Sequence, residues 1–131
     1  MQRLELVHDW LARQFPGRPL SVAPASADAS FRRYFRVTFD DGLTRIVMDA
    51  PPEHEDCRPF VHVAGLLHEA GVHAPEILAQ DLERGLLLLT DLGSITYLDA
   101  LDASNADGLF RDALDAILKW QLASRPDALP P

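Results

Sequence analysis

The chain is poor in cysteine and lysine. Its single cysteine, Cys57, permits no internal disulfide and no multi-cysteine zinc site, and this usage predicts a reducing compartment, the cytoplasm. Of the 12 basic residues only Lys119 is a lysine, so lysine-dependent chemistry must use that residue or be absent. No run approaches the roughly 20 apolar residues of a membrane span, and the N-terminus has no signal-peptide pattern. We therefore expect neither a membrane protein nor a secreted one.

Positive charge is scarce as well. The 20 acidic residues outnumber the 12 basic ones and give a formal net charge of -8, which disfavours binding to nucleic acid or to an anionic membrane. A small-molecule ligand is favoured instead. The length of 131 residues, with 47% hydrophobic and 24% charged residues, fits one soluble domain or part of one.

Hydrophobic periodicity and turn residues predict an α+β fold in which strands come first and helices last. Helices are expected at residues 3–15 and 58–70, near 95–101, and in a longer stretch after residue 105. Strands are expected at residues 20–25, 31–39, 43–48, 75–80 and 86–89, with a hairpin turn at 40–42. The four leucines at 86–89 indicate a strand that is buried on both faces. We expect a sheet-bearing lobe at 1–90, a hinge at 91–94 and the start of a helical lobe at 95–131.

A polar loop between the first two strands is the candidate binding segment. Its short side chains let the backbone approach an anion such as a phosphate, and two arginines follow them. The alternative stays open that the loop only forms a turn, with Asp28 and Ser30 bonded to backbone and the arginines solvated. The segment consists of Ala27, Asp28, Ala29, Ser30, Phe31, Arg32 and Arg33.

Other reactive residue types do not form a site pattern. The histidines of residues 58–73 lack the paired spacing of a zinc helix, so surface positions are favoured over a metal site. Cys57 precedes Arg58, which could lower its pKa, but no catalytic histidine pattern accompanies it. The acidic run at residues 53–56 fits a mobile connection better than a cation site. We predict no metal site and no catalytic residue within these 131 residues.

Four segments together carry a family resemblance. They read DASFRRYFR at residues 28–36, VMDAPP at 47–52, GVHAP at 71–75 and LLTDLG at 88–93. With these segments the chain resembles the N-terminal lobe of the protein-kinase-like fold. Among the proteins of that fold it resembles the aminoglycoside phosphotransferase family. It looks closest to the bacterial branch that phosphorylates the anomeric hydroxyl of N-acetylmuramate and N-acetylglucosamine in cell-wall recycling.

The resemblance implies a five-stranded antiparallel sheet with a packed helix, followed by the first helices of a C-terminal lobe. ATP with Mg²⁺ and a sugar acceptor are the implied ligands, and the loop at residues 27–33 would cover the ATP phosphates. Val47 would line the adenine pocket, and Asp49 would stand at the strand position beside the phosphates. Thr90, Asp91 and Leu92, at and just before the hinge, would also bind the nucleotide, with the backbone of the last two at the adenine edge.

The chain also departs from that family pattern. Asp49 stands where a lysine is usual, and the helix position of its glutamate partner falls near Val61 or His62. Arg32 or Arg33 would then take the cationic role. The catalytic loop of the family lies beyond residue 131, so we expect an N-terminal portion that is inactive alone. The alternative is a non-catalytic interaction module of kinase-like fold, and in either case an uncovered apolar helix face near the C-terminus would promote self-association.

Overall fold

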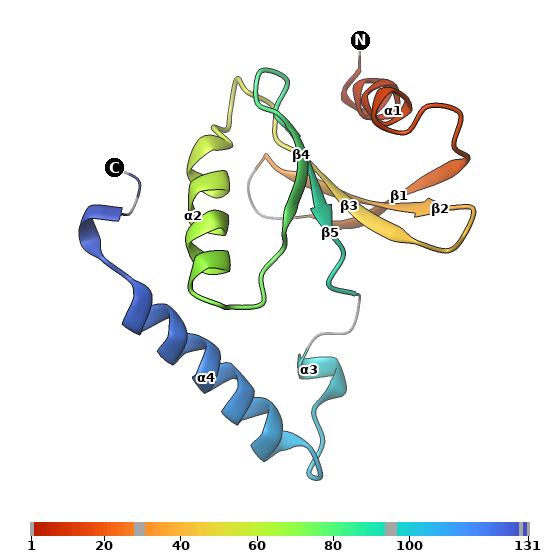
Figure 1. Ribbon diagram of the computed structural model, residues 1–131. Coiled ribbons are helices and arrows are strands. Elements are labelled where there is room, and N and C mark those ends of the chain that lie inside the picture. Colours follow the sequence, from red (N-terminus) through yellow and green to blue (C-terminus); the bar gives the residue numbers. More distant parts are fainter. Residues whose placement is uncertain (1, 28–30, 94–96, 129, 131) are drawn as a thin grey trace.

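The computed structural model describes residues 2–27, 31–93, 97–128 and 130. Figure 1 shows a sheet with one helix on each side and a long helix that runs below them. The helices are α1 (Arg3–Gln14), α2 (Arg58–Glu69), α3 (Tyr97–Ala100), α4 (Ala106–Ala123) and the short 3-10 helix η1 (Pro126–Ala128). The strands are β1 (Leu20–Ala27), β2 (Arg33–Phe39), β3 (Thr44–Asp49), β4 (Ile77–Asp81) and β5 (Leu86–Thr90).

The strands form one sheet in the order β1-β2-β3-β5-β4, and every neighbouring pair is antiparallel. This arrangement confirms the predicted α+β fold of the kinase-like N-terminal lobe, with α2 inserted between β3 and β4. The predicted hairpin turn is also present. Gly42 has a φ of 87°, a left-handed conformation that glycine adopts without strain, and its N–H donates to the Phe39 carbonyl over 3.0 Å.

The first strand is longer than its sequence indicated. The strand was predicted to end at residue 25, yet β1 continues to Ala27, with a register shift between Pro24 and Ser26. β1 is an edge strand, and a proline is tolerated there because its nitrogen, which has no N–H to donate, can face the side that pairs with no other strand. The pairing of β1 with β2 resumes after this register shift and extends to the candidate loop.

Two apolar cores lie on opposite faces of the sheet because side chains alternate along each strand. Under α1, Val7, Trp10 and Leu11 pack against residues of β2, β3 and β5. Under α2, the core consists of Met48, Ala50, Cys57, Leu87 and Leu89, with Phe60 and Val61 of α2 packed on it. Leu86, Leu87, Leu88 and Leu89 divide between the two cores and are all at most 3% exposed, which confirms that β5 is buried on both faces.

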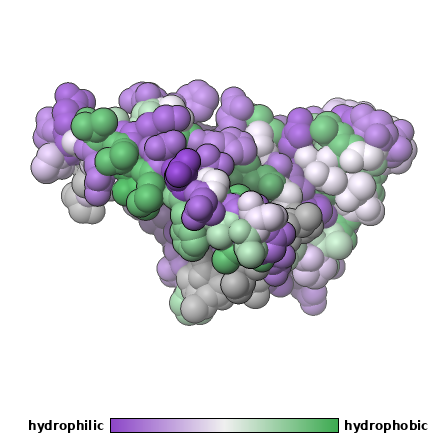
Figure 2. All heavy atoms as spheres, turned by 90° about the horizontal axis from the view of Figure 1, so that it is seen from below, coloured by the Kyte–Doolittle hydropathy of each residue, from purple (hydrophilic) through white to green (hydrophobic). Residues whose placement is uncertain are grey.

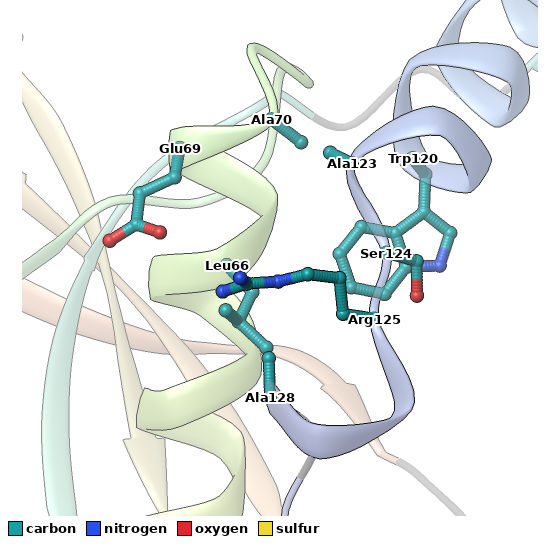
Figure 3. Close-up of a pocket in the computed structure, with 8 residues that line it drawn as sticks. All are labelled: Leu66, Glu69, Ala70, Trp120, Ala123, Ser124, Arg125 and Ala128. Carbon is teal, nitrogen blue, oxygen red and sulfur yellow. The ribbon is translucent and has the colours of Figure 1, made fainter.

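The long helix α4 leaves most of its apolar side chains uncovered. Leu114, Ile117 and Leu118 are each at least 50% exposed, and the view from below shows a band of hydrophobic surface among hydrophilic neighbours (Figure 2). The end of α4 meets α2 at a hollow of about 230 Å³, bordered by Leu66 on one side and Trp120 on the other (Figure 3). Among the described residues, no helix is both long and apolar enough to cross a membrane.

Candidate functional site

The two faces of the sheet separate the predicted site residues. On β3, Val47 and Asp49 point to the α1 side, whereas Ile46 and Met48 point to the α2 side. Val47 and Asp49 both have no exposed surface. The two side chains, which were predicted to contact adenine and phosphate, therefore offer no accessible surface to a ligand. Side chains on the α2 face are the remaining candidates for a nucleotide site.

Asp49 is enclosed by two arginines. One carboxylate oxygen accepts a hydrogen bond from Arg3 Nε of α1 at 2.9 Å, and the other accepts one from Arg33 Nη2 of β2 at 3.0 Å. Arg3 also donates to the Arg84 carbonyl at 2.7 Å. The pairing of Asp49 with Arg3 was not predicted, and Arg33 was considered for phosphate instead. The two arginines join α1 to the sheet and to the turn before β5.

Arg32 and Arg33 diverge to opposite faces. While Arg33 turns to Asp49, the Arg32 guanidinium lies 5.5 Å from the Phe60 ring of α2, and its Nε is 3.5 Å from an oxygen of Glu55. Phe31 stacks on His54 with ring centroids 4.0 Å apart. The second half of the candidate loop is therefore held against the connection between β3 and α2, and Arg32 supplies positive charge on the α2 face.

The tip of the candidate loop falls outside the described residues, which include neither Asp28, Ala29 nor Ser30. The backbone on both sides of it is defined, because Ala27 of β1 pairs with Arg33 of β2. The loop thus closes the hairpin of β1 and β2, as expected.

The connection that was expected to be mobile is partly ordered by its contacts. The side chain of Glu55 is only 17% exposed beside Arg32. Cys57 is 5% exposed, and burial raises the pKa of its thiol, although the charge of Arg32 acts in the opposite direction. The lowered pKa considered for Cys57 is wrong, because desolvation exceeds the nearby positive charge.

The predicted nucleotide-binding residues Thr90, Asp91 and Leu92 lie at the end of β5 and directly after it. The Thr90 hydroxyl accepts a hydrogen bond from the Glu76 N–H at 2.9 Å, and Leu92 is 52% exposed. With Asp91 they border a hollow of about 430 Å³, whose other wall includes Gly71, Val72, His73 and Ala74. Two of the four resembling segments, far apart in sequence, therefore meet at this point.

The Asp91 side chain has the strongest polar contacts of the hinge. Arg36 of β2 donates from Nε to Oδ2 at 2.7 Å and from Nη2 to Oδ1 at 3.2 Å. These hydrogen bonds, together with those from the Gly93 N–H and the Thr44 side chain, lower the pKa of Asp91 to about 2. Arg36 was not among the predicted site residues, and only its place on the α2 side of β2 could have indicated it.

The lowered pKa predicts a dependence of stability on pH. Relative to the ordinary value of 3.8, ionised Asp91 contributes about 2 kcal/mol to the free energy of unfolding. This contribution is present above pH 4 and is lost as the pH falls through 2, because the protonated carboxyl no longer carries the negative charge that strengthens its contact with Arg36. In urea unfolding, Asp91→Asn should lose about this amount at pH 7 and progressively less towards pH 2.

The control is Asp115→Asn, at an exposed position of α4, which should change stability by less than about 0.5 kcal/mol at either pH. A loss of stability in Asp91→Asn that stays constant with pH would contradict the prediction.

Carboxylates and histidines do not gather elsewhere in the described part of the chain. No group of three or more His, Cys, Asp or Glu side chains there is arranged to hold a metal ion. On α2, Val61 packs on the apolar core and the His62 ring contacts the Ala128 carbonyl. Besides Asp91, which pairs with Arg36, Glu55 meets a cation on this face; it lies before the helix and was not predicted in that role.

Comparison with known proteins gives consistent matches. The profile of the phosphotransferase enzyme family matches residues 21–131. An N-acetylmuramate/N-acetylglucosamine kinase of Pseudomonas aeruginosa is 61% identical over 112 residues, covering 86% of this chain and 33% of that protein. The protein of the same name from Pseudomonas putida is 58% identical over 110 residues, covering 84% and 32%.

A more distant relative extends the match. The N-acetylmuramate/N-acetylglucosamine kinase of Neisseria meningitidis is 37% identical over 134 residues, covering 99% of this chain and 40% of that protein. The chain thus spans about a third of the length of the two Pseudomonas kinases. Because the family profile covers most of the sequence and the sheet has the expected topology, the chain belongs to the phosphotransferase enzyme family.

Proposed function

We propose that the chain is the N-terminal, nucleotide-binding portion of an ATP-dependent phosphotransferase whose acceptor is an amino sugar. The family match and the names of the relatives support this function. Residues 1–90 form the nucleotide-binding lobe, 91–94 the hinge, and 95–131 the start of a helical lobe. Phosphorylation of N-acetylmuramate or N-acetylglucosamine would serve cell-wall recycling in the cytoplasm, where ATP is supplied.

The observation that carries the nucleotide site is the position of Arg32. Phosphoryl transfer depends mainly on positioning and on neutralising charge on the phosphates. In a chain with a net charge of -8, a cation must be local to attract ATP. Arg32 is directed to the α2 face beside the loop, where it also contacts Glu55 and Phe60, whereas Arg33 pairs with the buried Asp49 on the α1 face. We therefore assign the phosphate contact to Arg32, with the backbone of residues 27–31 over the phosphates.

The base of ATP would lie further along the same face. Ile46 is partly buried there, paired with Arg36 on one side and Leu89 on the other, and it replaces Val47 as the apolar contact in our proposal. The backbone of Asp91 and Leu92 would meet the edge of the base. In this arrangement the base and the phosphates of ATP would lie along the same face of the sheet, between the start of the hinge and the candidate loop.

Magnesium and the acceptor would be held largely by other groups. Mg²⁺ usually keeps several waters and binds through one or two carboxylates together with substrate phosphates, so we expect it to arrive with ATP. The described residues hold no cluster of metal-binding side chains. We place the aspartate that orients the sugar hydroxyl, and most sugar contacts, outside these 131 residues.

The choice between the two arginines can be tested by titrating ATP with Mg²⁺ and following amide chemical shifts. Arg32→Gln should raise the Kd by about tenfold or more, because a charged hydrogen-bond donor to phosphate is lost. Arg33→Gln should change the Kd by less than about twofold, because its partner is Asp49. Equal losses of affinity in both variants, or a larger loss for Arg33→Gln, would reject the assignment.

The wider function is tested by ADP release with N-acetylmuramate or N-acetylglucosamine. We expect no turnover by the 131 residues and turnover by a chain extended to the length of the relatives. Strong turnover by the short chain would contradict the proposal. An extended chain that neither binds ATP nor releases ADP would instead favour the non-catalytic interaction module.

A further inference from the structure

One ion pair connects the hinge to the strand that follows the candidate loop. Arg36 of β2 and Asp91 are 55 positions apart, and they meet through two parallel hydrogen bonds of 2.7 and 3.2 Å. The Asp91 side chain is 6% exposed and that of Arg36 is 28% exposed. Such a two-point contact fixes the relative orientation of the two planar groups as well as their distance.

The same pair also holds the backbone of the next residues. Oδ1 of Asp91 accepts a hydrogen bond from the Gly93 N–H at 2.8 Å, and Arg36 Nη2 donates to the Gly93 carbonyl at 3.3 Å. Both peptide groups of Gly93 are therefore bound by the two side chains of one ion pair. The path of the chain from β5 into residues 91–93 is set by these contacts.

The pair lies on the α2 side of the sheet. Arg36 is opposite Ile46 in the register of β2 and β3, and it alternates with Phe35 and Val37, which face α1. Asp91 follows the last residue of β5, next to β3, and the Thr44 side chain of β3 also donates to it. The contact thus crosses β3 and ties β2, whose hairpin carries the candidate phosphate loop, to the hinge.

We propose that Arg36 and Asp91 are positioning residues for the base of the nucleotide. This inference depends on the proposed ATP site. Their ion pair binds the backbone of Gly93, which fixes the path of Asp91 and Leu92, whose backbone would meet the base, relative to the loop over the phosphates. Loss of the pair weakens recognition of the base, whereas the charge that attracts the phosphates remains with Arg32.

The test compares a ligand that has a base with one that lacks it. For Arg36→Gln, the Kd of ATP with Mg²⁺ should rise about tenfold, because the hinge backbone is no longer held, whereas the Kd of inorganic tripolyphosphate should stay within about twofold. Arg36→Lys keeps the charge without the two-point contact and should give a smaller rise, of about threefold for ATP. Arg18→Gln breaks an exposed contact with Asp41 at the other end of the hairpin and should leave both constants unchanged.

The outcomes separate the inference from the function on which it depends. If the unmodified chain binds neither ligand, both are rejected. If it binds ATP and Arg36→Gln binds ATP equally well, or loses both ligands to the same extent, the positioning role is rejected and the nucleotide site is retained. If Arg36→Gln does not fold, Arg36→Lys carries the same comparison of ATP with tripolyphosphate.

Discussion

Replacement of Asp49 by alanine should lower the free energy of unfolding by about 3 kcal/mol. The carboxylate has no exposed surface and accepts hydrogen bonds from Arg3 and Arg33. Its removal leaves two guanidinium groups without their anion. The loss is at the lower end of the range for a broken buried pair, because Arg3 and Arg33 are 25% and 51% exposed and can be partly rehydrated. Urea unfolding followed by the fluorescence of the buried Trp10 measures the change.

An exposed ion pair provides the matched control. Asp41 contacts Arg18 over 2.9 Å, but the two side chains are 58% and 34% exposed. Asp41→Ala should therefore cost less than about 1 kcal/mol, because water screens the pair and solvates the remaining charge. Similar losses of stability for the two variants would mean that the burial of Asp49 does not increase what its ion pairs contribute to the free energy of unfolding. A large difference would support a structural role for the buried Asp49.

The elements of the fold could be predicted because their local signals agree. The turn at residues 40–42 contains the glycine that the hairpin needs, and the leucines of 86–89 have no polar alternation, as a strand buried on both faces requires. Helix α1 differs in one detail. Leu4, which shares the helical spacing of Val7 and Leu11, is 43% exposed, whereas Val7 and Leu11 are fully buried. Only the packing of α1 on the sheet decides which end of the apolar stripe is covered.

The assignment of site residues to a sheet face could not be predicted, and the reason lies in β3. Val47 and Met48 of β3 and Ala50 directly after it are all apolar and all fully buried, since α1 covers one face and α2 the other. An alternating pattern that would distinguish the faces is therefore missing. The same limit applies to Arg32 and Arg33, which are chemically equal and differ only in the side of the strand from which they project.

Contacts between segments that are distant in the chain could not be predicted from the sequence either. Asp91 was predicted for its backbone, but the partner of its side chain, Arg36, lies 55 positions away and follows no local rule. Glu55 was predicted as part of a mobile connection, because an acidic run is usually solvated. Its contact with Arg32 arises from the way α2 packs on the sheet, which brings the start of the helix beside the end of the candidate loop.

The turn before β5 should tolerate almost no side chain at Gly85. Gly85 has a φ of 74°, and a Cβ added there would lie 1.8 Å from the Ala50 carbonyl oxygen. The Ala50 N–H also donates to the Gly85 carbonyl at 2.8 Å, so the two backbones cannot separate without losing this bond. Gly85→Ala should therefore cost about 4 kcal/mol, from left-handed strain together with displacement of the end of β3. Thermal and urea unfolding of the variant measure the loss.

Gly42 separates the two causes of that loss. Its φ of 87° is similar, but a Cβ added there would meet nothing within 4 Å. Gly42→Ala should therefore show the conformational strain alone, about 1 kcal/mol. The difference between the variants then measures the close approach of the turn to β3, beside the buried Asp49. If Gly85→Ala were no less stable than Gly42→Ala, the end of β3 would have to move freely, and the close contact between the turn and Ala50 would not contribute to stability.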